Sequence, residues 1–585
     1  MPHGGDLVAE LLVRSGVTHV FGQPGGQTAA LYDGIARRAP AIGHVLVRDE
    51  RSAAYASDAS ARLTGFPGVC DVTVGPGATK LADGLVESLG ASVPVIALVG
   101  ELPRDWEPYR DHGVASQGFD QVAFLSSITK ATLRVPSVGA LAQQVRAAFR
   151  IATTARPGPV AVLLPHDVLD AEWEPEHDPA EVDDRYLRAP AFRPLPEAVE
   201  LRRAADLLGR AERPLIVAGG GVHASRAAPD VTALAERIGA VTATSFSGKG
   251  AIEEDSPLAA GVLNPLGSTA ALALARRADL VLWCGCKVGQ NTSNNWTLPL
   301  EGQVTIHLDV DPAELGRTFR PSVALNGDAG ATLRALLELL PEQARASWRQ
   351  EAELARKEEA AGRAGEEGSD AAPILPQRVM RELAGRLRPG DVVVSDASFS
   401  AGWVATHLQA RRATRDFLFA RGQGGLGYAL PASLGARLAR PAPARVVTVS
   451  GDGGFSYGLG ELATFAAMGL PAVHVVLNNG SLAWLAMWQR LFFEGLRQSV
   501  DLGSASFAGV AEALGCAGFT VTEPGEIGPA LDEAFASGRP AVVDVRTDPE
   551  ATPIHGYRRR LREGGTHPRP GTVYGLPPWR RSPEG

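Results

Sequence analysis

The sequence predicts three α/β domains in series, each built on a doubly wound parallel sheet. Three observations predict this fold class. The chain has 585 residues, well beyond the length at which a single hydrophobic core keeps growing. Apolar residues make up 45% and charged residues 21% of the chain, which is an ordinary globular composition. Short β-branched runs alternate with helical stretches over most of its length, as in parallel sheets covered by helices.

The first domain is expected over residues 1–171. It opens with an amphipathic helix in MPHGGDLVAELLVRSG, and its strands are expected in GVTHVFG, AIGHVLV, GVCDVTV, VPVIALVG and PGPVAVLLP. The stretch 172–197 is rich in Pro and acidic residues and has neither helical nor strand periodicity. We therefore expect a linker there.

The second and third domains are expected over residues 198–340 and 372–550. Strands of the second are expected in PLIVAGGG, ADLVLWCG and VTIHLDVDP, and strands of the third in DVVVSD, ARVVTVSG, PAVHVVLN and PAVVDVR. Between the two domains, a charged segment (346–373) is helix-prone at first and broken by Gly and Ser at its end, which predicts a second linker.

The C-terminal tail, 551–585, is rich in arginine. Gly and Pro are interspersed among the arginines, which favours a solvated surface tail over a polyanion-binding site. The arginines are Arg558, Arg559, Arg560, Arg562, Arg569, Arg580 and Arg581.

Charge and cysteine content narrow the class of partner. The net charge of −8 gives no reason to expect nucleic acid or an anionic membrane, so the expected partners are small molecules. The four cysteines (Cys70, Cys284, Cys286, Cys516) are too few for a disulfide framework and are expected to be buried, reduced thiols. With no apolar signal region and no run of about 18 apolar residues, the protein is expected to be cytoplasmic.

Two glycine- and amide-containing motifs follow strands of the third domain. The strand ARVVTVS runs into Gly451-Asp452-Gly453-Gly454, and the strand PAVHVVL runs into Asn478-Asn479, with 24 residues (454–477) between the GDG and the NN. We expect 454–469 to form a crossover helix that makes the two strands neighbours, so that both motifs lie at the ligand crevice. Glycines let a diphosphate approach the backbone, and Asp452 and Asn479 offer the oxygen ligands that Mg²⁺ prefers.

This pair of motifs resembles the signature of the thiamine-diphosphate (ThDP) enzymes, a GDG followed some 24 to 27 residues later by NN. The resemblance implies a ThDP-binding fold with pyrimidine, central and diphosphate domains. It also implies that Mg²⁺ is held by Asp452, Asn479 and the backbone carbonyl of Ser481, and that Gly451, Gly453 and Gly454 line the diphosphate.

A second segment supplies the acid that such enzymes need. Arg48-Asp49-Glu50-Arg51 precedes ARLTGFPGVCDVTVGPGATK, which is similar to the acetolactate synthase segment in which a Glu precedes a helix and a TG-x-PGV…GPGATN stretch. The resemblance implies that Glu50 hydrogen-bonds the aminopyrimidine ring of ThDP and so helps remove the proton on C2 of its thiazolium. A solvated acid at a helix N-terminus is the alternative. Because Glu50 and the metal motif lie in different domains, the family arrangement implies a homodimer or homotetramer with sites shared between subunits.

The similarity to acetolactate synthases extends over nearly the whole chain. VFGQPGGQTAALYDG resembles the family's VFG-x-PGG loop, and 116–121 its FQE-x-DQ loop. The resemblance implies substrate contacts by Gln117, Gly25 and Gly26, and cofactor contacts by Pro24, Thr79 and Leu426. Leu426 falls where a bulky residue supports the bent cofactor, and is otherwise a core residue. Trp484, Met487 and Trp488 are expected to shape the acceptor pocket, or else to belong to the core.

One loop departs from the synthase pattern. The synthases carry G-x-RFDDR in the central domain, and its last Arg grips the carboxylate of the acceptor 2-oxo acid. Here 285–291 reads GCKVGQN, so Asn291 takes that place unless Lys287 has taken over the carboxylate. An amide is a poor substitute for a bidentate arginine. We therefore expect an acceptor other than a simple 2-oxo acid, such as an aldehyde or ketone, and FAD stays an open possibility.

The sequence analysis thus predicts a ThDP- and Mg²⁺-dependent carboligase. Its donor is expected to be a 2-oxo acid, most naturally pyruvate, whose acyl unit passes to a carbonyl acceptor after loss of CO₂. No histidine lies beside the metal motif to protonate the intermediate, which favours carboligation over simple decarboxylation. The alternatives are authentic acetolactate synthase, a non-ligating decarboxylase, a flavin-dependent oxidase and a catalytically silent subunit. Intact Glu50, Asp452 and Asn479 argue against the last.

Overall fold

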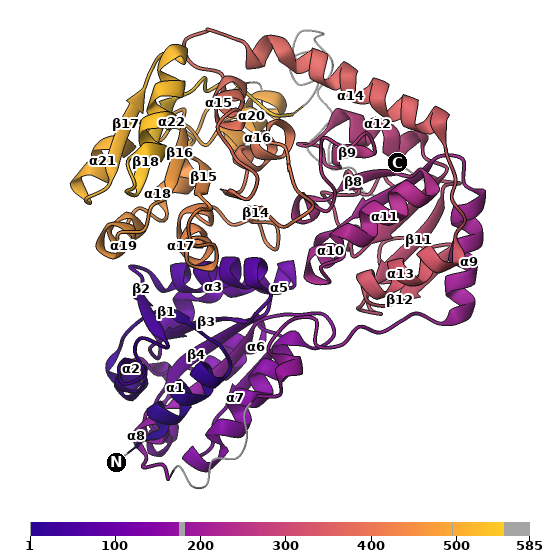
Figure 1. Ribbon diagram of the computed structural model, residues 1–585. Helices are drawn as coiled ribbons and strands as arrows, with labels where there is room; N and C mark the ends of the chain where they lie inside the picture. The colour runs from indigo at the N-terminus through magenta and orange to yellow at the C-terminus, as the bar shows by residue number, and fades with distance from the viewer. Residues whose placement is uncertain (1, 175–181, 494, 555–585) are drawn as a thin grey trace. The chain divides into compact units, whose positions relative to one another are not determined.

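The structure is a computed structural model that describes residues 2–174, 182–493 and 495–554. It contains three parallel sheets of six strands each, so the predicted fold class is confirmed (Figure 1). The chain divides into two compact units. The first comprises Met1–Phe192, Ala420–Val446 and Gly458–Leu470, and the second comprises Arg193–Phe419, Val447–Tyr457 and Pro471–Gly585. Two segments of the predicted third domain therefore group with the first unit, and the predicted domain boundaries stay a prediction.

The first sheet lies in the first unit and has the strand order β2-β1-β3-β4-β6-β5. Its strands are β1 (His19–Gln23), β2 (Gly43–Leu46), β3 (Gly68–Val72), β4 (Val95–Glu101), β5 (Ala131–Arg134) and β6 (Val160–Pro165). A hydrophobic core joins one face to α1 (Gly4–Arg14), α2 (Ala29–Ala36), α7 (Val138–Thr153) and α8 (His166–Asp170). The other helices are α3 (Glu50–Thr64), α4 (Pro76–Lys80), α5 (Ala82–Ala91) and α6 (Gln121–Ser126). The predicted N-terminal helix is α1, whose apolar side is buried.

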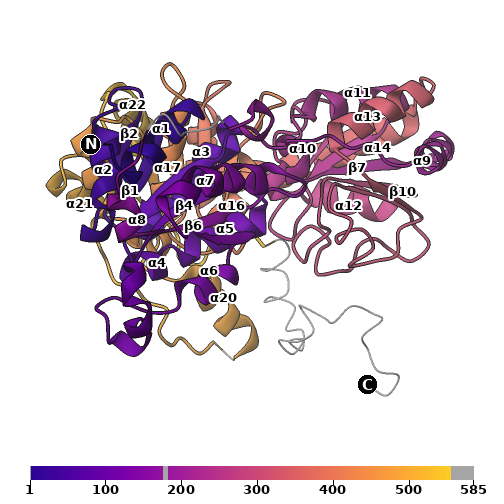
Figure 2. The ribbon, with the colours of Figure 1, turned by 90° about the horizontal axis from the view of Figure 1, so that it is seen from below.

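The central sheet lies in the second unit and has the order β12-β11-β10-β7-β8-β9. Its strands are β7 (Pro214–Ala218), β8 (Val241–Thr244), β9 (Ala259–Val262), β10 (Leu280–Cys284), β11 (Val304–Asp309) and β12 (Val323–Asn326). Figure 2 shows α11 (Ala228–Ile238) and α13 (Ala329–Leu339) on one side of this sheet and α12 (Thr269–Arg277) on the other. The remaining helices are α9 (Ala198–Arg210) and α10 (Gly220–Ala224).

The third sheet repeats the order of the first, β14-β13-β15-β16-β18-β17. Its strands are β13 (Val392–Ser395), β14 (Phe417–Phe419), β15 (Val446–Gly451), β16 (Val473–Asn478), β17 (Ala517–Val521) and β18 (Ala541–Arg546). The helices of this part of the second unit are α15 (Pro376–Ala384), α16 (Phe399–His407), α18 (Asp452–Ser456), α20 (Ala483–Phe492), α21 (Phe507–Ala513) and α22 (Ile527–Ala536).

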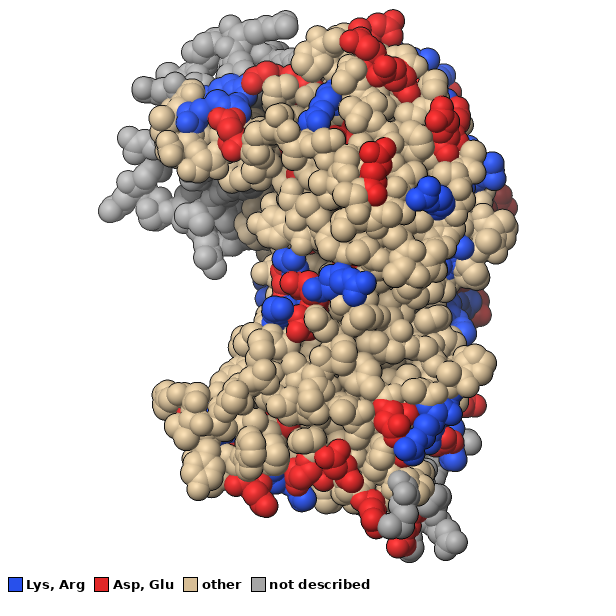
Figure 3. Space-filling model, turned by 90° about the vertical axis from the view of Figure 1, so that its left-hand side faces the viewer, with Lys and Arg blue, Asp and Glu red and all other residues tan. Residues whose placement is uncertain are grey.

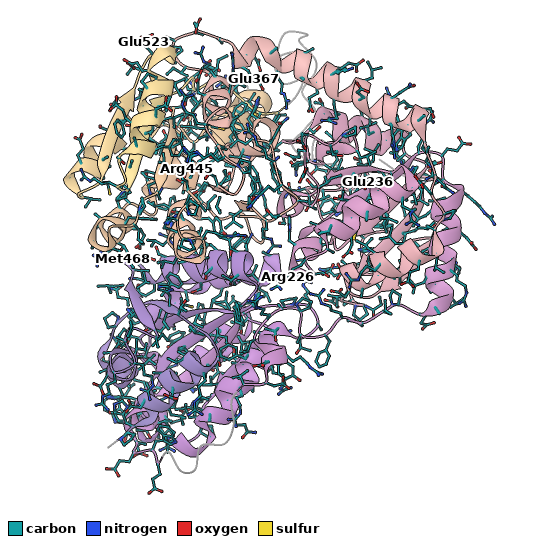
Figure 4. The ribbon with its side chains drawn as sticks, in the orientation of Figure 1. Arg226, Glu236, Glu367, Arg445, Met468 and Glu523 are labelled. Carbon is teal, nitrogen blue, oxygen red and sulfur yellow. The ribbon has the colours of Figure 1, made fainter. Side chains whose placement is uncertain are left out.

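The charged segment between the second and third domains forms one helix, α14 (Ala346–Glu367), longer than its sequence indicates. Trp348 anchors its start, because the indole is fully buried and donates to Pro214 O at 2.9 Å. At its end Glu367, labelled in Figure 4, accepts from His407 Nδ1 at 2.8 Å. The second linker is therefore a docked helix. Of the first linker, 172–197, the described part contains only a short 3₁₀ turn, Asp184–Tyr186.

The prediction of a single crossover helix over 454–469 is wrong. The chain forms α18, which is one short turn, and then a separate helix α19 (Glu461–Met468) after residues 457–460. Two glycines in the break, Gly458 and Gly460, explain it, because glycine disfavours the helix interior. A side chain at Gly458 would also meet Pro431 Cδ at 3.2 Å.

Several expectations from composition can be compared with the described residues. All four cysteines are free and buried, as predicted. Among the described helices, none combines the length and apolar character needed to cross a bilayer. On the face shown in Figure 3, basic and acidic side chains are interspersed. The arginines of the tail, from Arg558 on, lie outside the described residues.

Candidate cofactor and active site

The carboxyl ends of the first sheet bring three predicted loops together. In this strand order the direction of winding reverses between β1 and β3, and such a switch point opens a crevice for ligands. The loop after β1 carries Pro24, Gly25 and Gly26, and the loop after β3 carries Thr73–Gly75. A side chain at Gly25 would begin 2.1 Å from Thr73 Oγ1, so the two loops touch.

Gln117 belongs to the same cluster of loops. It is exposed, has a positive φ of 67°, and lies against Gly75, where an added Cβ would be 2.7 Å from Gln117 Cβ. Gln121 fixes the loop from beneath: its Oε1 accepts from Gly75 N at 2.9 Å, and its Nε2 donates to Gly100 O at 3.0 Å. Thr79 is also exposed, and its hydroxyl donates to Pro76 O at 3.0 Å. Gly25, Gly26 and Gln117 thus lie in one cluster of loops, and their contacts with substrate, like the cofactor contacts of Pro24 and Thr79, stay predictions.

Glu50 is the first residue of α3, directly after the loop that follows β2. Asp49 caps the helix by accepting from Arg51 N at 2.9 Å. Glu50 itself is only 6% exposed, so it is not the solvated surface acid of the alternative interpretation. Its Oε2 accepts from Lys80 Nζ at 2.9 Å, and Lys80 is half exposed. Burial and the nearby carboxylates of Asp71 and Glu50 raise the pKa of Tyr32, so these groups share one charged neighbourhood.

A buried acid holds the segment that precedes Leu426. The two carboxylate oxygens of Glu87 accept from the backbone N–H groups of residues 421–424 at 2.7–3.2 Å. Arg62 donates to the same carboxylate at 3.0 Å. Burial alone would raise the pKa of Glu87, but Arg62 and the backbone amides lower it below its ordinary value. Glu87 thus fixes the backbone of residues 421–424, shortly before Leu426. Leu426 itself is half-buried.

The second unit holds the predicted metal motif. Asp452 is the first residue of α18, and its side chain accepts from Gly453 N at 2.9 Å and from Gly480 N at 2.6 Å. These bonds tie the loop after β15 to the loop after β16, so the structure brings the GDG and NN motifs together. Burial raises the pKa of Asp452, and the backbone hydrogen bonds offset only part of that rise. A cation beside this carboxylate would restore its charge.

The two asparagines have different roles. Asn478 is buried and structural, since its amide donates to Asp544 Oδ1 at 2.8 Å and to Ala505 O at 3.0 Å. Asn479 is half-buried, and its Oδ1 accepts from Ser481 N at 3.0 Å. The side-chain oxygens of Asp452 and Asn479 therefore both lie at the turn 480–481 and form one oxygen-rich corner. This donor set suits Mg²⁺.

The three glycines of the motif differ in the space around them. At Gly454 an added Cβ would lie 2.9 Å from Asp396 Oδ1, and at Gly453 it would lie 2.8 Å from Leu482 Cδ2. At Gly451 the nearest atom of this kind is Ser400 Oγ, 4.0 Å away. The backbone is thus packed on one side and open at Gly451. This arrangement fits a ligand that binds against main-chain atoms, as a diphosphate does.

The predicted acceptor residues pack largely as core. Met487 is buried, and Trp484 and Trp488 are partly buried against the core of the third sheet. The indole of Trp484 meets the ring of Phe399 edge-on, with centroids 5.4 Å apart. The core alternative therefore has support for all three, and a role in substrate binding stays a prediction.

Asn291 and Lys287 lie in the loop after β10 of the central sheet. Asn291 is exposed, and Lys287 is half-buried. The winding of this sheet reverses between β7 and β10, and there Gly221 N donates to Gly285 O at 3.0 Å. Asn291 thus follows the switch point of the central sheet, where a ligand crevice is expected.

A second cluster with metal-ligating side chains is less suitable. Of the described residues, His3, Asp6 and Asp33 form the one group of three His, Cys, Asp or Glu side chains close enough to share an ion. Arg37 and Arg38 already pair with its carboxylates at 2.6–3.2 Å. The cluster is therefore a surface ion-pair network.

Lys80 and Glu87 are not among the residues predicted from the sequence. Lys80 stands where the synthase pattern GPGATN has an asparagine, so the departure was visible in GPGATK. Glu87 has no local motif, because its partners at 421–424 are more than 330 residues away.

Family models of known proteins match three parts of the chain. Three family models match: the N-terminal TPP-binding domain of thiamine pyrophosphate enzymes (residues 2–124), their central domain (201–336) and their C-terminal TPP-binding domain (396–545). Thiamine pyrophosphate and thiamine diphosphate are the same molecule.

Similar full-length relatives are acetolactate synthases. The chain is 34% identical to the probable acetolactate synthase large subunit of Methanocaldococcus jannaschii, over 94% of this chain and 93% of that protein. It is 31% identical to the acetolactate synthase isozyme 2 large subunit of Escherichia coli, over 93% and 96%. It is 30% identical to the acetolactate synthase large subunit of Corynebacterium glutamicum, over 94% and 88%.

Proposed function

Because the chain belongs to the thiamine pyrophosphate enzymes, we propose that it is an acetolactate synthase-like carboligase that uses ThDP and Mg²⁺. The observation that carries the proposal is the pair of half-sites: a buried Glu50 at the crevice of the first sheet, and an oxygen-rich corner at Asp452 and Asn479. Both are needed for activity, and a catalytically silent subunit would need neither.

Residues of the two half-sites would hold the cofactor. Asp452, Asn479 and the Ser481 carbonyl would bind Mg²⁺, while the backbone at Gly451, Gly453 and Gly454 would receive the diphosphate. Leu426 would support the bent cofactor, next to Pro24 and Thr79. When bound, ThDP supplies a carbanion that adds to a carbonyl and stabilises the charge left after decarboxylation.

The chain's own residues then have three tasks. Glu50 holds a proton at its carboxyl group against the aminopyrimidine ring. Gln117 and the backbone at Gly25 and Gly26 steady the negative oxygen that develops on the substrate carbonyl. In the overall reaction a 2-oxo acid loses CO₂ and its acyl group forms a carbon–carbon bond with the acceptor carbonyl, whose oxygen takes up one proton.

The proposed donor is pyruvate, and the proposed acceptor is a carbonyl compound without a carboxylate. The acceptor proposal depends on Asn291, which stands where the synthase pattern has an arginine. Loss of a charge-assisted hydrogen bond to a carboxylate corresponds to about 1.5–3 kcal/mol, or roughly ten- to a hundredfold in acceptor use. A cytoplasmic homodimer or homotetramer completes the proposal. FAD is not needed for this reaction, and the visible absorbance of the purified protein decides whether it is bound.

The cofactor assignment is tested by calorimetry on Asp452→Asn, which keeps the shape of the side chain but removes its charge. Titration of wild type with ThDP should show tight binding only with Mg²⁺, and the variant should lose that metal dependence. Asp532→Asn, an exposed acid paired with Arg386 and outside the motif, is the matched control and should bind as wild type does. Unchanged affinity in Asp452→Asn would remove the metal assignment.

The acceptor is tested by two substitutions in the same loop. Asn291→Arg should increase acetolactate formation from pyruvate alone, whereas Lys287→Met should leave it unchanged. If wild type makes acetolactate from pyruvate at a rate that no added aldehyde or ketone exceeds, and Lys287→Met abolishes it, then Lys287 binds the carboxylate. The protein would then be an authentic acetolactate synthase, the function that its relatives' names indicate.

A further inference from the structure

The ion pair between Lys80 and Glu50 places a positive charge directly on the proposed activating acid. Lys80 Nζ lies 2.9 Å from Glu50 Oε2. Glu50 opens α3 and Lys80 ends α4, so the contact is fixed from two helices of the same unit. The lysine side chain is 50% exposed and the glutamate side chain only 8%. The charge of the buried partner is thus matched by a cation that reaches in from solvent.

A buried carboxylate has a physical reason to lose its charge. Removal from water favours the neutral acid, and a cation within about 4–6 Å favours the ionised form. The synthase pattern has an uncharged asparagine where this chain has Lys80. Lys80 therefore supplies a compensating charge to a carboxyl group that the proposed mechanism depends on.

We propose that Lys80 is a positioning residue that keeps Glu50 ionised and oriented before ThDP binds, and so sets the lowest pH at which the cofactor can be activated. The inference rests on the proposed function, because it assumes that Glu50 meets the cofactor. The hydrogen bond between Glu50 and the aminopyrimidine ring contains one proton. If Glu50 is ionised in the free protein, that proton comes from solvent when ThDP binds.

Lys80 is able to act in this way through the whole neutral range. Its hydrogen bond to Glu50 raises the pKa of Lys80 above the usual value, so the ammonium form persists. Other titratable and charged groups also lie near the glutamate, and all of them are unchanged when only Lys80 is replaced. They are Tyr32 on α2, His44 on β2, Asp71 on β3, Glu461 on α19, and the sequence neighbours Arg48, Asp49 and Arg51.

Proton uptake on ThDP binding tests the proposal without measuring turnover. Calorimetry in the presence of Mg²⁺, in pairs of buffers that differ in ionisation enthalpy, gives the number of protons taken up at each pH. Uptake should approach one where free Glu50 is ionised and should fall at low pH, where Glu50 already carries the proton. In Lys80→Met the midpoint of this fall should move to higher pH, because the cation beside the carboxylate is gone.

Two further variants make the result specific. Lys80→Arg retains the positive charge and should restore the wild-type midpoint. Lys357→Met removes an exposed lysine that pairs with Glu353 on α14, and it should leave the midpoint unchanged. If Lys80→Met binds ThDP with the wild-type midpoint, the role of Lys80 is refuted while the proposed function stands. If wild-type protein does not bind ThDP with Mg²⁺, the proposed function itself fails.

Discussion

At the scale of single residues, the site depends on where α3 begins. Asp49 caps the helix, and Glu50 follows as its first residue, buried against the crevice of the first sheet. A carboxylate at this position also interacts favourably with the positive end of the helix. The cap and the strand before it therefore fix the direction of the acid that the reaction needs.

Replacement of Glu50 by glutamine should separate cofactor binding from cofactor activation. Glu50→Gln keeps the size of the side chain but cannot exchange a proton, so we expect ThDP affinity within tenfold of wild type. The exchange of the C2 proton of bound ThDP, followed by NMR after quenching in acid, should slow by roughly 10²–10⁴. Glu10→Gln, in the surface pair with Arg14, is the control. Exchange at the wild-type rate in Glu50→Gln would make Glu50 an ordinary acid.

Residue identities in the site were predictable only where a local pattern carries them. Asp452 and Asn479 follow strands at a fixed spacing, and the structure brings their loops together through Gly480. The roles of Lys80 and Glu87 were not predictable, because each depends on a contact made by the fold. Glu87 reaches amides of residues 421–424, and no periodicity in the sequence relates the two segments.

At the scale of elements, the first unit depends on the close approach of α3 and α17 (Ala429–Ala439). Gly435 on α17 lies so near α3 that an added Cβ would be 1.8 Å from Ala56 O. The phenol of Tyr428, just before α17, donates to Asp58 Oδ1 at 2.9 Å, and Tyr55 meets the ring of Tyr428 edge-on. The helix that begins with Glu50 is thus packed against the helix that follows Leu426.

The substitution Gly435→Ala should push these two helices apart. Overpacking of this kind typically lowers stability by about 1–3 kcal/mol, and backbone atoms cannot move aside as a side chain can. Thermal unfolding should show a lower Tm than that of wild type. Calorimetry should show weaker ThDP binding. Gly362→Ala in α14 is the matched control, because no atom lies within 4 Å of its added Cβ, and there alanine should be neutral or slightly stabilising. Equal Tm values for the two variants would contradict the packing argument.

The third sheet contains a buried histidine that predicts an acid limit to stability. His474 on β16 is fully buried, and burial lowers its pKa to about 3. In the unfolded chain this imidazole takes up a proton below about pH 6.5, whereas the folded protein cannot. The contribution of the neutral His474 to the free energy of unfolding is therefore complete above pH 6.5. It is lost as pH falls toward 3, by about 1.4 kcal/mol per pH unit.

The contribution of His474 is measured as the change in Tm between two pH values. The Tm of wild type should fall between pH 7.5 and 5.5 by more than the Tm of His474→Gln, because the glutamine does not titrate. Comparison of the two falls cancels the contribution of carboxyl groups, which both proteins share. Equal falls would mean that His474 is protonated in the folded protein.

At the scale of the whole molecule, the alternation of strands and helices was enough to predict three parallel sheets. It gives no information about the two compact units of the chain, and the predicted domain boundaries stay a prediction. Residues 420–446 and 458–470 group with the first unit, and the expected crossover helix is broken at residues 457–460. The grouping of 420–446 with the first unit follows from tertiary contacts such as those of Glu87 and Gly435, whereas the break follows from Gly458 and Gly460.

The shared site predicted for a homodimer can be tested with two inactive variants. If each site takes Glu50 from one subunit and Asp452 from the other, a mixture of Glu50→Gln and Asp452→Asn chains will form hybrids with one intact site. After dissociation and reassembly, activity should return to about a quarter of the wild-type level, since half of the dimers are hybrids with one working site. No recovery in hybrids verified by native mass spectrometry would place both residues of a site in one chain.

The central claim is that the protein joins two carbonyl compounds through a new carbon–carbon bond. The most direct test is mass spectrometry of the products formed from ¹³C-labelled pyruvate, with ThDP and Mg²⁺, alone and with a panel of aldehydes and ketones. We predict release of CO₂ together with a labelled hydroxyketone whose mass equals that of the acceptor plus an acetaldehyde unit. Release of CO₂ with labelled acetaldehyde as the sole product, whatever acceptor is present, would contradict the claim and make the protein a simple decarboxylase.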